Sequence, residues 1–292
     1  MSDKYILITP CKNEGDNLPS LINSIVAQEI KPIVWVIIDD GSTDNTPDIL
    51  KFYQKQYIWI KVLHLSENPR DVGLHLAGVM KKGFDYAIDY CRLNGLEYDY
   101  LGNVDGDLIL PSTFFKNLLN EFNLNPRLGV ASGGTDYTIN NKKVRAKLSV
   151  NEPSGGHMLI RRTCFEECGG LPISHAVDSV LKAKARLRNW QTKRFEDNIA
   201  TEIRDVSNAE GYWKGKVQSG RSAYYLNLNP LHVIVKAIKY TPKKPYYIGI
   251  AYLFGYLSDL IKRKEQIEDS EIKQYFWNKW RILIYGRKRQ NL

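Results

Sequence analysis

The sequence of 292 residues contains few cysteines and no long hydrophobic run, and these two absences exclude several classes of protein. Its four cysteines are too few for a disulfide-stapled fold, and no histidine or second cysteine pair stands near Cys164 and Cys168 at zinc-site spacing. The apolar run at residues 5–8 has the length of a strand and not that of a secretory signal. The longest uncharged apolar stretch, from Tyr246 to Ser258, falls short of the roughly 20 residues that a membrane-spanning helix needs. We therefore expect a cytoplasmic protein with buried, reduced cysteines.

The composition is that of a folded protein, and its charge is uneven. Apolar residues make up 43% and charged residues 25% of the chain, which argues against disorder. The formal net charge is +9, and the excess gathers late, at Lys243-Lys244, Lys262-Arg263-Lys264 and Arg287-Lys288-Arg289. A basic C-terminal part favours an anionic partner, such as phosphate groups, nucleic acid or an acidic membrane surface.

The first 110 residues alternate apolar strands with amphipathic helices. The periodicity predicts strands at 5–9, 34–38, 60–65 and 98–104, and helices at 17–28, 46–56 and 73–90. Because strands separated by helices form right-handed βαβ units, we expect an α/β fold with a Rossmann-like, mostly parallel sheet flanked by helices. After residue 110 the pattern loosens, and it predicts strands at 128–133 and 144–150 with a polar loop at 135–143 between them.

Three polar clusters follow predicted strands at the point where each strand ends. They are Pro10–Glu14, Asp39–Asp44 and Asp105–Asp107. Ligands of parallel α/β sheets bind beyond the carboxyl ends of the strands, so we expect the three clusters to meet at one site.

Two of these clusters suit a metal ion and a nucleotide, although each also has a simpler explanation. Asp105 and Asp107 stand two residues apart, and such carboxylate oxygens bind Mg²⁺ or Mn²⁺, whereas Asp-Gly-Asp alone is most often a plain turn. The adjacent acids Asp39 and Asp40 resist burial unless a group such as a base N–H or a ribose hydroxyl binds them. Residues 42–44 are equally good N-caps for the helix predicted at 46–56.

Four segments together resemble the successive motifs of family 2 glycosyltransferases. They are residues 8–14 (Ile-Thr-Pro-Cys-Lys-Asn-Glu), 37–44 (Ile-Ile-Asp-Asp-Gly-Ser-Thr-Asp), 104–107 (Val-Asp-Gly-Asp) and 155–172, which begins Gly-Gly-His-Met-Leu-Ile-Arg-Arg and ends Gly-Gly-Leu-Pro. The segments stand in the family's order. The resemblance implies a GT-A fold and an inverting enzyme that transfers a sugar from a nucleotide-diphosphate donor with the help of a divalent ion, Mn²⁺ or Mg²⁺.

The resemblance also implies which residues bind the donor. On the nucleotide side these are Pro10, Lys12, Glu14, Asp39, Asp40, Arg70 and Asp105. Lys12 stands where the family often has an aromatic residue, and Arg70 is either a donor contact or a solvated loop arginine. Asp107 would hold the metal ion, with Glu202 as a weaker second ligand.

The acceptor side is implied by the later segment. Asp178 falls where the family places the carboxylate that takes the acceptor's proton, although Val177 replaces the glutamate that often precedes it. Asp178 is alternatively a plain N-cap of the following helix. The acceptor or the diphosphate would also contact Gly155, Gly156 and His157. Arg221 is a further candidate for a diphosphate contact, because residues 218–221 partly match the Gln-x-x-Arg-Trp signature of processive polysaccharide synthases, although Ser222 replaces the tryptophan. For His157 a structural role remains the alternative, and for Arg221 a place on the surface.

The C-terminal residues point to a separate helical part. Residues 1–225 would form the GT-A domain, with the nucleotide-binding part at about 1–110 and the acceptor part at about 111–225. Residues 226–292 would form a helical, aromatic and basic extension. Aromatic and aliphatic side chains beside lysine and arginine are typical of an interfacial helix on an anionic leaflet. We expect a glycan or lipid-linked acceptor of cell envelope glycan biosynthesis, and a protein that can contact the inner face of the cell membrane peripherally.

Three other functions fit parts of the sequence. A sugar nucleotidyltransferase would need a Gly-rich basic loop, but residues 9–17 contain one glycine and one lysine. A nucleic-acid-binding module would need a basic and aromatic stripe, against which the acidic clusters argue, so we expect no nucleic-acid partner. The third alternative is a non-catalytic GT-A-like nucleotide-binding protein, and only the presence of Asp105, Asp107 and Asp178 argues against it.

Overall fold

The computed structural model describes residues 3–66, 73–139, 142–146, 149–205, 211–240, 242 and 246–281. Its contacts divide the chain into two compact units, Met1–Asp205 and Val206–Leu292. This division falls after Asp205, whereas the sequence predicts a GT-A domain that ends at about residue 225. Within the described residues, every helix is too short or too polar to cross a bilayer.

The first unit is built around one sheet, which has nine strands in the described residues. Its strands are β1 (Tyr5–Cys11), β2 (Val34–Asp39), β3 (Ile60–His64), β4 (Tyr100–Asn103), β5 (Leu108–Ile109), β6 (Leu128–Ile139), β7 (Lys142–Arg145), β8 (Met158–Arg161) and β9 (Gln191–Asp205). Its helices are α1 (Leu18–Val26), α2 (Thr46–Gln56), α3 (Leu74–Leu93), α4 (Phe114–Leu124), the 3₁₀ turn η1 (Gly155–His157), α5 (Arg162–Glu167) and α6 (Val177–Leu187).

The sheet has a parallel half and a mixed half. Its order is β3-β2-β1-β4-β8-β6-β9-β5, with β7 paired to β6. The strands β3, β2, β1 and β4 are parallel, as the βαβ alternation predicts. β8 runs antiparallel to both of its neighbours, and β5 runs antiparallel to β9, so the sheet as a whole is mixed rather than mostly parallel.

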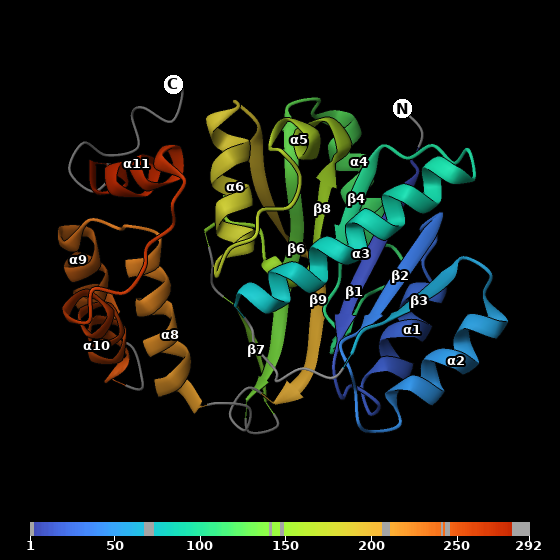
Figure 1. Cartoon of the computed structure of the whole chain (residues 1–292), viewed down its shortest axis with the longest axis horizontal. Coiled ribbons are helices and arrows are strands. Elements are labelled where there is room, and N and C mark those ends of the chain that lie inside the picture. The colour runs from blue at the N-terminus through green and yellow to red at the C-terminus, as the bar shows by residue number, and fades with distance from the viewer. Residues whose placement is uncertain are drawn as a thin grey trace. The chain divides into compact units, whose positions relative to one another are not determined.

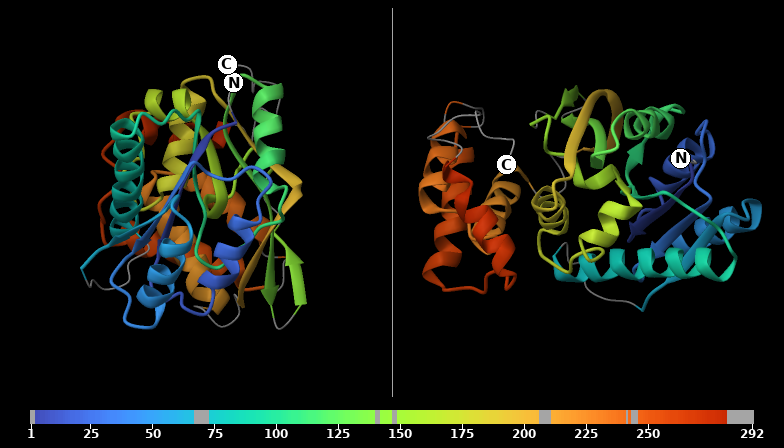
Figure 2. Two further views of the ribbon diagram at one scale, coloured as in Figure 1. Left: turned by 90° about the vertical axis from the view of Figure 1, so that its right-hand side faces the viewer. Right: turned by 90° about the horizontal axis from the view of Figure 1, so that it is seen from above.

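Helices cover both faces of this sheet, which explains why its central strands are apolar throughout. Alternate residues of β1 face opposite cores: Tyr5 and Leu7 pack with α1, α2 and α4, whereas Ile6 and Ile8 pack with α3, α5 and α6. The two helical layers are visible in Figures 1 and 2. Every residue of β2 is buried, as expected of a parallel strand enclosed on both sides.

One prediction for the second half of the unit is wrong, and one strand is not predicted at all. Residues 135–139 and 142–143 do not form a loop, because β6 continues to Ile139 and pairs with β7. A cross-strand ion pair between Asp136 and Arg145 stabilises this polar extension. The long strand β9, which the sequence analysis does not predict, pairs in parallel with β6 and antiparallel with β5.

The second unit is helical, as the sequence predicts for the C-terminal part. Its helices are α8 (Gly211–Tyr225), α9 (Pro230–Tyr240), α10 (Ile248–Ile261) and α11 (Ser270–Asn278). α10 packs closely against α8, because Gly220 and Gly255 let the two backbones approach. A Cβ at Gly255 would lie 2.0 Å from the Val217 carbonyl oxygen.

Candidate active site

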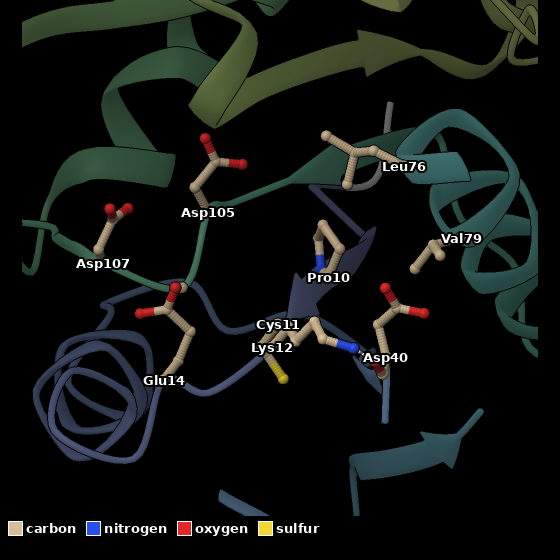
Figure 3. Close-up of a pocket in the computed structure, with 10 residues that line it drawn as sticks. Pro10, Cys11, Lys12, Glu14, Asp40, Leu76, Val79, Asp105 and Asp107 are labelled. Carbon is tan, nitrogen blue, oxygen red and sulfur yellow. Dashed lines mark hydrogen bonds between the residues drawn. The ribbon is translucent and has the colours of Figure 1, made fainter. Parts of the chain in front are cut away.

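The three polar clusters meet in one pocket at the carboxyl ends of the parallel strands. β1, β2 and β4 are neighbours in the sheet, and one cluster follows each of them. The pocket is lined by Pro10, Cys11, Lys12, Glu14, Asp40, Leu76, Val79, Asp105, Gly106 and Asp107. Figure 3 shows Asp105, Asp107 and Glu14 gathered on one side of it. Asp40 lies on the other side, next to α3, so the pocket offers two separate acidic sides to one ligand.

The turn after β2 holds the turn after β1 in place. Ser42 Oγ accepts a hydrogen bond from Asn13 N at 2.8 Å, and Asn13 Oδ1 accepts one from Thr43 N at 2.8 Å. Asn13 adopts a φ of 53°, a left-handed conformation that asparagine tolerates. Asp44 accepts a hydrogen bond from Thr46 N at 3.0 Å. The polar turn therefore both orders the pocket wall and supports the first turn of α2.

Lys12 reaches across to the same turn. Its ammonium group donates hydrogen bonds to the carbonyl oxygens of Asp40 at 2.8 Å and Gly41 at 3.3 Å, and Figure 3 shows the side chain spanning the pocket wall. The lysine thus ties two loops together at the position where the family often has an aromatic side chain.

Two histidines for which the sequence predicts no role partner the adjacent acids Asp39 and Asp40. His64 Nδ1 lies 3.0 Å from Asp39 Oδ2, and His75 Nε2 lies 2.8 Å from both carboxylate oxygens of Asp40. Both acids are almost fully buried. The protein itself therefore supplies partners for these charges. The strand register could have identified the role of His64, because it pairs His64 of β3 with Asp39 of β2.

Carboxylates concentrate on the other side of the pocket. Asp105 is exposed to the pocket, and its carboxylate lies close to Gly156. Desolvation there, and then the charges of Asp107, Glu202, Glu14 and Asp178, raise the pKa of Asp105 to about 8. Desolvation and the charge of Asp107 also raise the pKa of Glu202 to about 7. The pairing of β5 with β9 brings Glu202 opposite Leu108, beside the Asp-Gly-Asp turn. Such an excess of negative charge favours the binding of a cation.

The residues present fit a metal ion that is shared with a diphosphate. In the part of the chain that the structure describes, no three His, Cys, Asp or Glu side chains are arranged to hold a metal ion by themselves. Mg²⁺ at nucleotide sites is usually bound by one or two carboxylates plus substrate phosphates, so a protein-only cage is not needed. Asp107 and Glu202 lie near enough to each other for the charge of Asp107 to raise the pKa of Glu202, so both carboxylates are candidates.

Arg204 is a residue of this site that the sequence analysis misses. Its guanidinium group donates a hydrogen bond to Glu14 and has Nε at 3.5 Å from Asp107 Oδ2. Arg204 follows Glu202 by two residues on β9, and alternate residues of a strand point to the same face. That spacing could have identified it, had β9 been predicted as a strand.

Two glycines pack between Asp178 and the Asp-Gly-Asp turn. Asp105 N donates a hydrogen bond to the Gly156 carbonyl oxygen at 2.8 Å, and Asn103 donates one to the Gly155 carbonyl oxygen at 2.8 Å. A Cβ at Gly156 would lie 2.6 Å from Asp105 Oδ2, and one at Gly155 would lie 3.2 Å from Asp178 Cβ. The Gly-Gly turn is therefore packed between the two acids, and side chains there would push them apart.

Asp178 is not the N-cap of its helix. α6 begins at Val177 after the N-cap Ala176, so Asp178 lies within the first turn, where a carboxylate is favourable to the helix dipole. Its Oδ2 accepts a hydrogen bond from Lys182 Nζ at 2.8 Å, and that ammonium also donates to the Pro153 carbonyl oxygen at 2.9 Å. The buried Lys182 thus fixes the direction of a partly exposed carboxylate.

Comparison with known proteins identifies the family. A model of Glycosyl transferase family 2 matches residues 6–177, which is more than half of the chain. The chain belongs to glycosyl transferase family 2. The match covers the pocket turns and the Gly-Gly segment and ends immediately before Asp178.

Curated relatives in family 2 are similar over parts of their length. The uncharacterized glycosyltransferase YibD of Escherichia coli is 35% identical over 63 residues, which is 22% of this chain and 18% of YibD. The poly-beta-1,6-N-acetyl-D-glucosamine synthase of Staphylococcus epidermidis is 25% identical over 140 residues, or 48% of this chain and 29% of the synthase. The chain therefore matches less than a third of either relative.

Solved structures show that the family 2 chain has the GT-A fold. A mannosyltransferase from Pyrobaculum calidifontis, in complex with GDP-Man and Mn²⁺, matches with a TM-score of 0.54 and 16% identity, over 87% of this chain and 70% of that one. TarS residues 1–349 of Staphylococcus aureus, in complex with UDP-GlcNAc, match with a TM-score of 0.52 and 16% identity, over 89% and 73%.

One acceptor-side candidate, His157, is buried and lies outside the pocket lining. His157 is 1% exposed, its Nε2 lies 3.2 Å from the Gly133 carbonyl oxygen, and burial lowers its pKa to about 4. His157 is therefore a structural residue of the core. Arg221 lies on α8 of the second unit, with its Nε 3.8 Å from Asp259. Arg70 falls outside the described residues.

Proposed function

We propose that this family 2 chain transfers a sugar, with inversion, from a nucleoside-diphosphate sugar to a glycan or lipid-linked acceptor. The observation that supports the proposal best is the single pocket lined by both Asp40 and Asp107. Asp40 and the side chains of Pro10 and Lys12 would contact the base and ribose, and Asp105 would face the ribose or diphosphate. The diphosphate would then extend toward Asp107.

A divalent ion, Mn²⁺ or Mg²⁺, would be held by Asp107 and the diphosphate, with Glu202 as a further contact. When bound, such an ion neutralises the charge that develops on the departing nucleoside diphosphate. Two observations support this: the gathering of Glu14, Asp105 and Asp107 on one side of the pocket, and the presence of Mn²⁺ with GDP-Man in the similar mannosyltransferase.

Asp178 would act as the general base. As the acceptor hydroxyl oxygen attacks the anomeric carbon, the bond from that carbon to the diphosphate breaks, and the hydroxyl proton passes to the Asp178 carboxylate. The proposal rests on two contacts: the packing of Gly155 against Asp178, and the hydrogen bond from Lys182 that leaves the other carboxylate oxygen for the acceptor.

A screen of donor hydrolysis tests the proposed reaction. The purified chain is incubated with UDP-, GDP-, CDP- and dTDP-sugars in the presence and absence of Mn²⁺, and released nucleoside diphosphate is measured. We expect hydrolysis of one base class above the others, and only with the metal ion. If no donor is hydrolysed and none protects the chain against thermal unfolding, the donor-site assignment is wrong.

The second unit would bring the enzyme to a membrane surface that carries its acceptor. All exposed side chains of α10 are apolar: Ile250, Phe254, Leu257, Leu260 and Ile261. The rings of Trp213 and Phe254 lie 6.3 Å apart and extend this apolar face. The exposed Lys262-Arg263-Lys264 follows directly, and basic residues beside exposed apolar ones favour an anionic leaflet.

Vesicle binding tests the membrane contact. We expect the chain to co-sediment with vesicles that contain phosphatidylglycerol, and the double variant Ile250→Glu, Phe254→Glu to bind at least about tenfold more weakly because two inserted side chains are lost. Ile58→Glu changes an even more exposed isoleucine of the first unit and should leave binding unchanged. Equal binding of the double variant and the unaltered chain would exclude this face.

A further inference from the structure

Arg204 places a permanent positive charge among the carboxylates of the pocket. It donates a hydrogen bond to Glu14 Oε1, and Asn17 donates one to the other oxygen of the same carboxylate at 2.7 Å. Glu14 is only 6% exposed, so this pairing is protected from water. Arginine does not lose its proton in proteins, so the charge stays at any ordinary pH.

The contact of Arg204 with Asp107 is the looser of its two ion pairs. Its Nε stands 3.5 Å from Asp107 Oδ2, which is longer than a normal hydrogen bond. Glu14 is therefore the anchor of the guanidinium group, whereas the contact with Asp107 can be given up at little cost. Asp107 is also the carboxylate to which the proposed function assigns the metal ion.

The backbone keeps Arg204 beside Asp107, whichever partner its side chain contacts. Ile203 N donates a hydrogen bond to the Asp107 carbonyl oxygen at 2.8 Å, and β5 pairs with β9 immediately next to it. Arg204 therefore cannot move far from Asp107 without breaking the sheet. A rotation of the side chain is enough, however, to turn a guanidinium group from a carboxylate toward a neighbouring phosphate.

We propose that Arg204 is an exchangeable counter-ion: it neutralises Asp107 in the donor-free protein, competes there with the divalent ion, and binds the diphosphate once the donor is present. The inference rests on the proposed function, because it takes the donor site as given. Two cations beside one carboxylate repel each other, so Arg204 and the metal ion compete for Asp107 until phosphate oxygens arrive. A guanidinium group suits phosphate because its planar donors bind two oxygens at once.

This inference predicts effects of opposite sign for one substitution. In Arg204→Gln the competitor is absent, so Mn²⁺ alone should bind the donor-free protein about tenfold more tightly. At saturating Mn²⁺, the nucleoside diphosphate should bind about tenfold more weakly, because a charged phosphate contact is lost. If Arg204 only held Glu14 and β9 in place, its substitution would weaken both affinities or change neither of them.

The measurements use the full chain. Binding of Mn²⁺ alone is followed by the electron paramagnetic resonance signal of the free ion, and binding of UDP, GDP, CDP and dTDP by calorimetry at saturating Mn²⁺. Arg204→Lys keeps the charge but not the planar group, so we expect it to bind Mn²⁺ like the unaltered chain and the diphosphate more weakly. Arg92→Gln, which removes an exposed arginine paired with Asp89, is the matched control and should change neither affinity.

The outcomes separate this inference from the proposed function. Suppose that the unaltered chain binds Mn²⁺ and a nucleoside diphosphate. If Arg204→Gln then has the same two affinities, or if both are weaker, only the exchange role of Arg204 is wrong. If the unaltered chain binds neither Mn²⁺ nor any of the four diphosphates, the donor site itself is wrong and the role of Arg204 falls with it. Thermal melting of each variant shows whether it is folded.

Discussion

Asp178→Asn should lower sugar transfer by at least about a thousandfold while leaving the affinity for donor within about twofold. The amide has the shape of the carboxylate, and its oxygen can still accept the hydrogen bond from Lys182, so α6 and the Gly-Gly turn should stay in place. It cannot take a proton from the acceptor, however. The loss should therefore appear in kcat and not in the binding of the nucleoside diphosphate.

The measurement pairs transfer kinetics on the best donor from the hydrolysis screen with calorimetry of the corresponding diphosphate. Asp85→Asn serves as the matched control, because Asp85 is an exposed residue of α3 that pairs with Lys81. Normal turnover by Asp178→Asn would mean that another group takes the proton. A parallel loss of donor affinity would mean that Asp178 supports the pocket instead of the chemistry.

The position of the pocket was predictable because it follows from topology. Three apolar strands separated by helices, each ending in a polar cluster, leave few arrangements, and in a parallel sheet all these ends lie at one edge. The side chains of Asp40, Asp105 and Asp107 could therefore be placed near each other before any coordinates were known. The resemblance to the family then supplied a chemistry for that edge.

The other half of the site was not predictable in this way. β9 is polar along much of its length and is held by its pairing with β6 and β5, which are distant in sequence. A local pattern carries little information about such a strand, since its partners define it. Arg204 was missed for that reason. The roles of His64 and His75 depend likewise on register and on the start of α3, which a single sequence does not specify.

Partners within the protein explain why the pocket can hold so many acids. Asp39 and Asp40 are each matched to a histidine, and Glu14 is matched to Arg204, whereas Asp105 carries a pKa raised to about 8. The two acids next to α3 therefore have histidine partners. On the side of the Asp-Gly-Asp turn several carboxylates share one arginine, so a ligand that brings its own cation gains most there.

Asp107→Ala should therefore remove the metal-dependent part of nucleoside diphosphate binding, which we expect to weaken by about a hundredfold or more at saturating Mn²⁺. The contacts on the side of Asp40 and Lys12 remain, so a weak, metal-independent affinity should persist. Removing the metal ion from the unaltered chain with a chelator should lower its affinity to the same residual level. Calorimetry with and without Mn²⁺ measures both, and Asp85→Ala controls for the loss of an aspartate elsewhere. If Asp107→Ala binds the diphosphate as tightly as the unaltered chain, the metal ion is either absent from the reaction or held by Glu202 and its neighbours without Asp107.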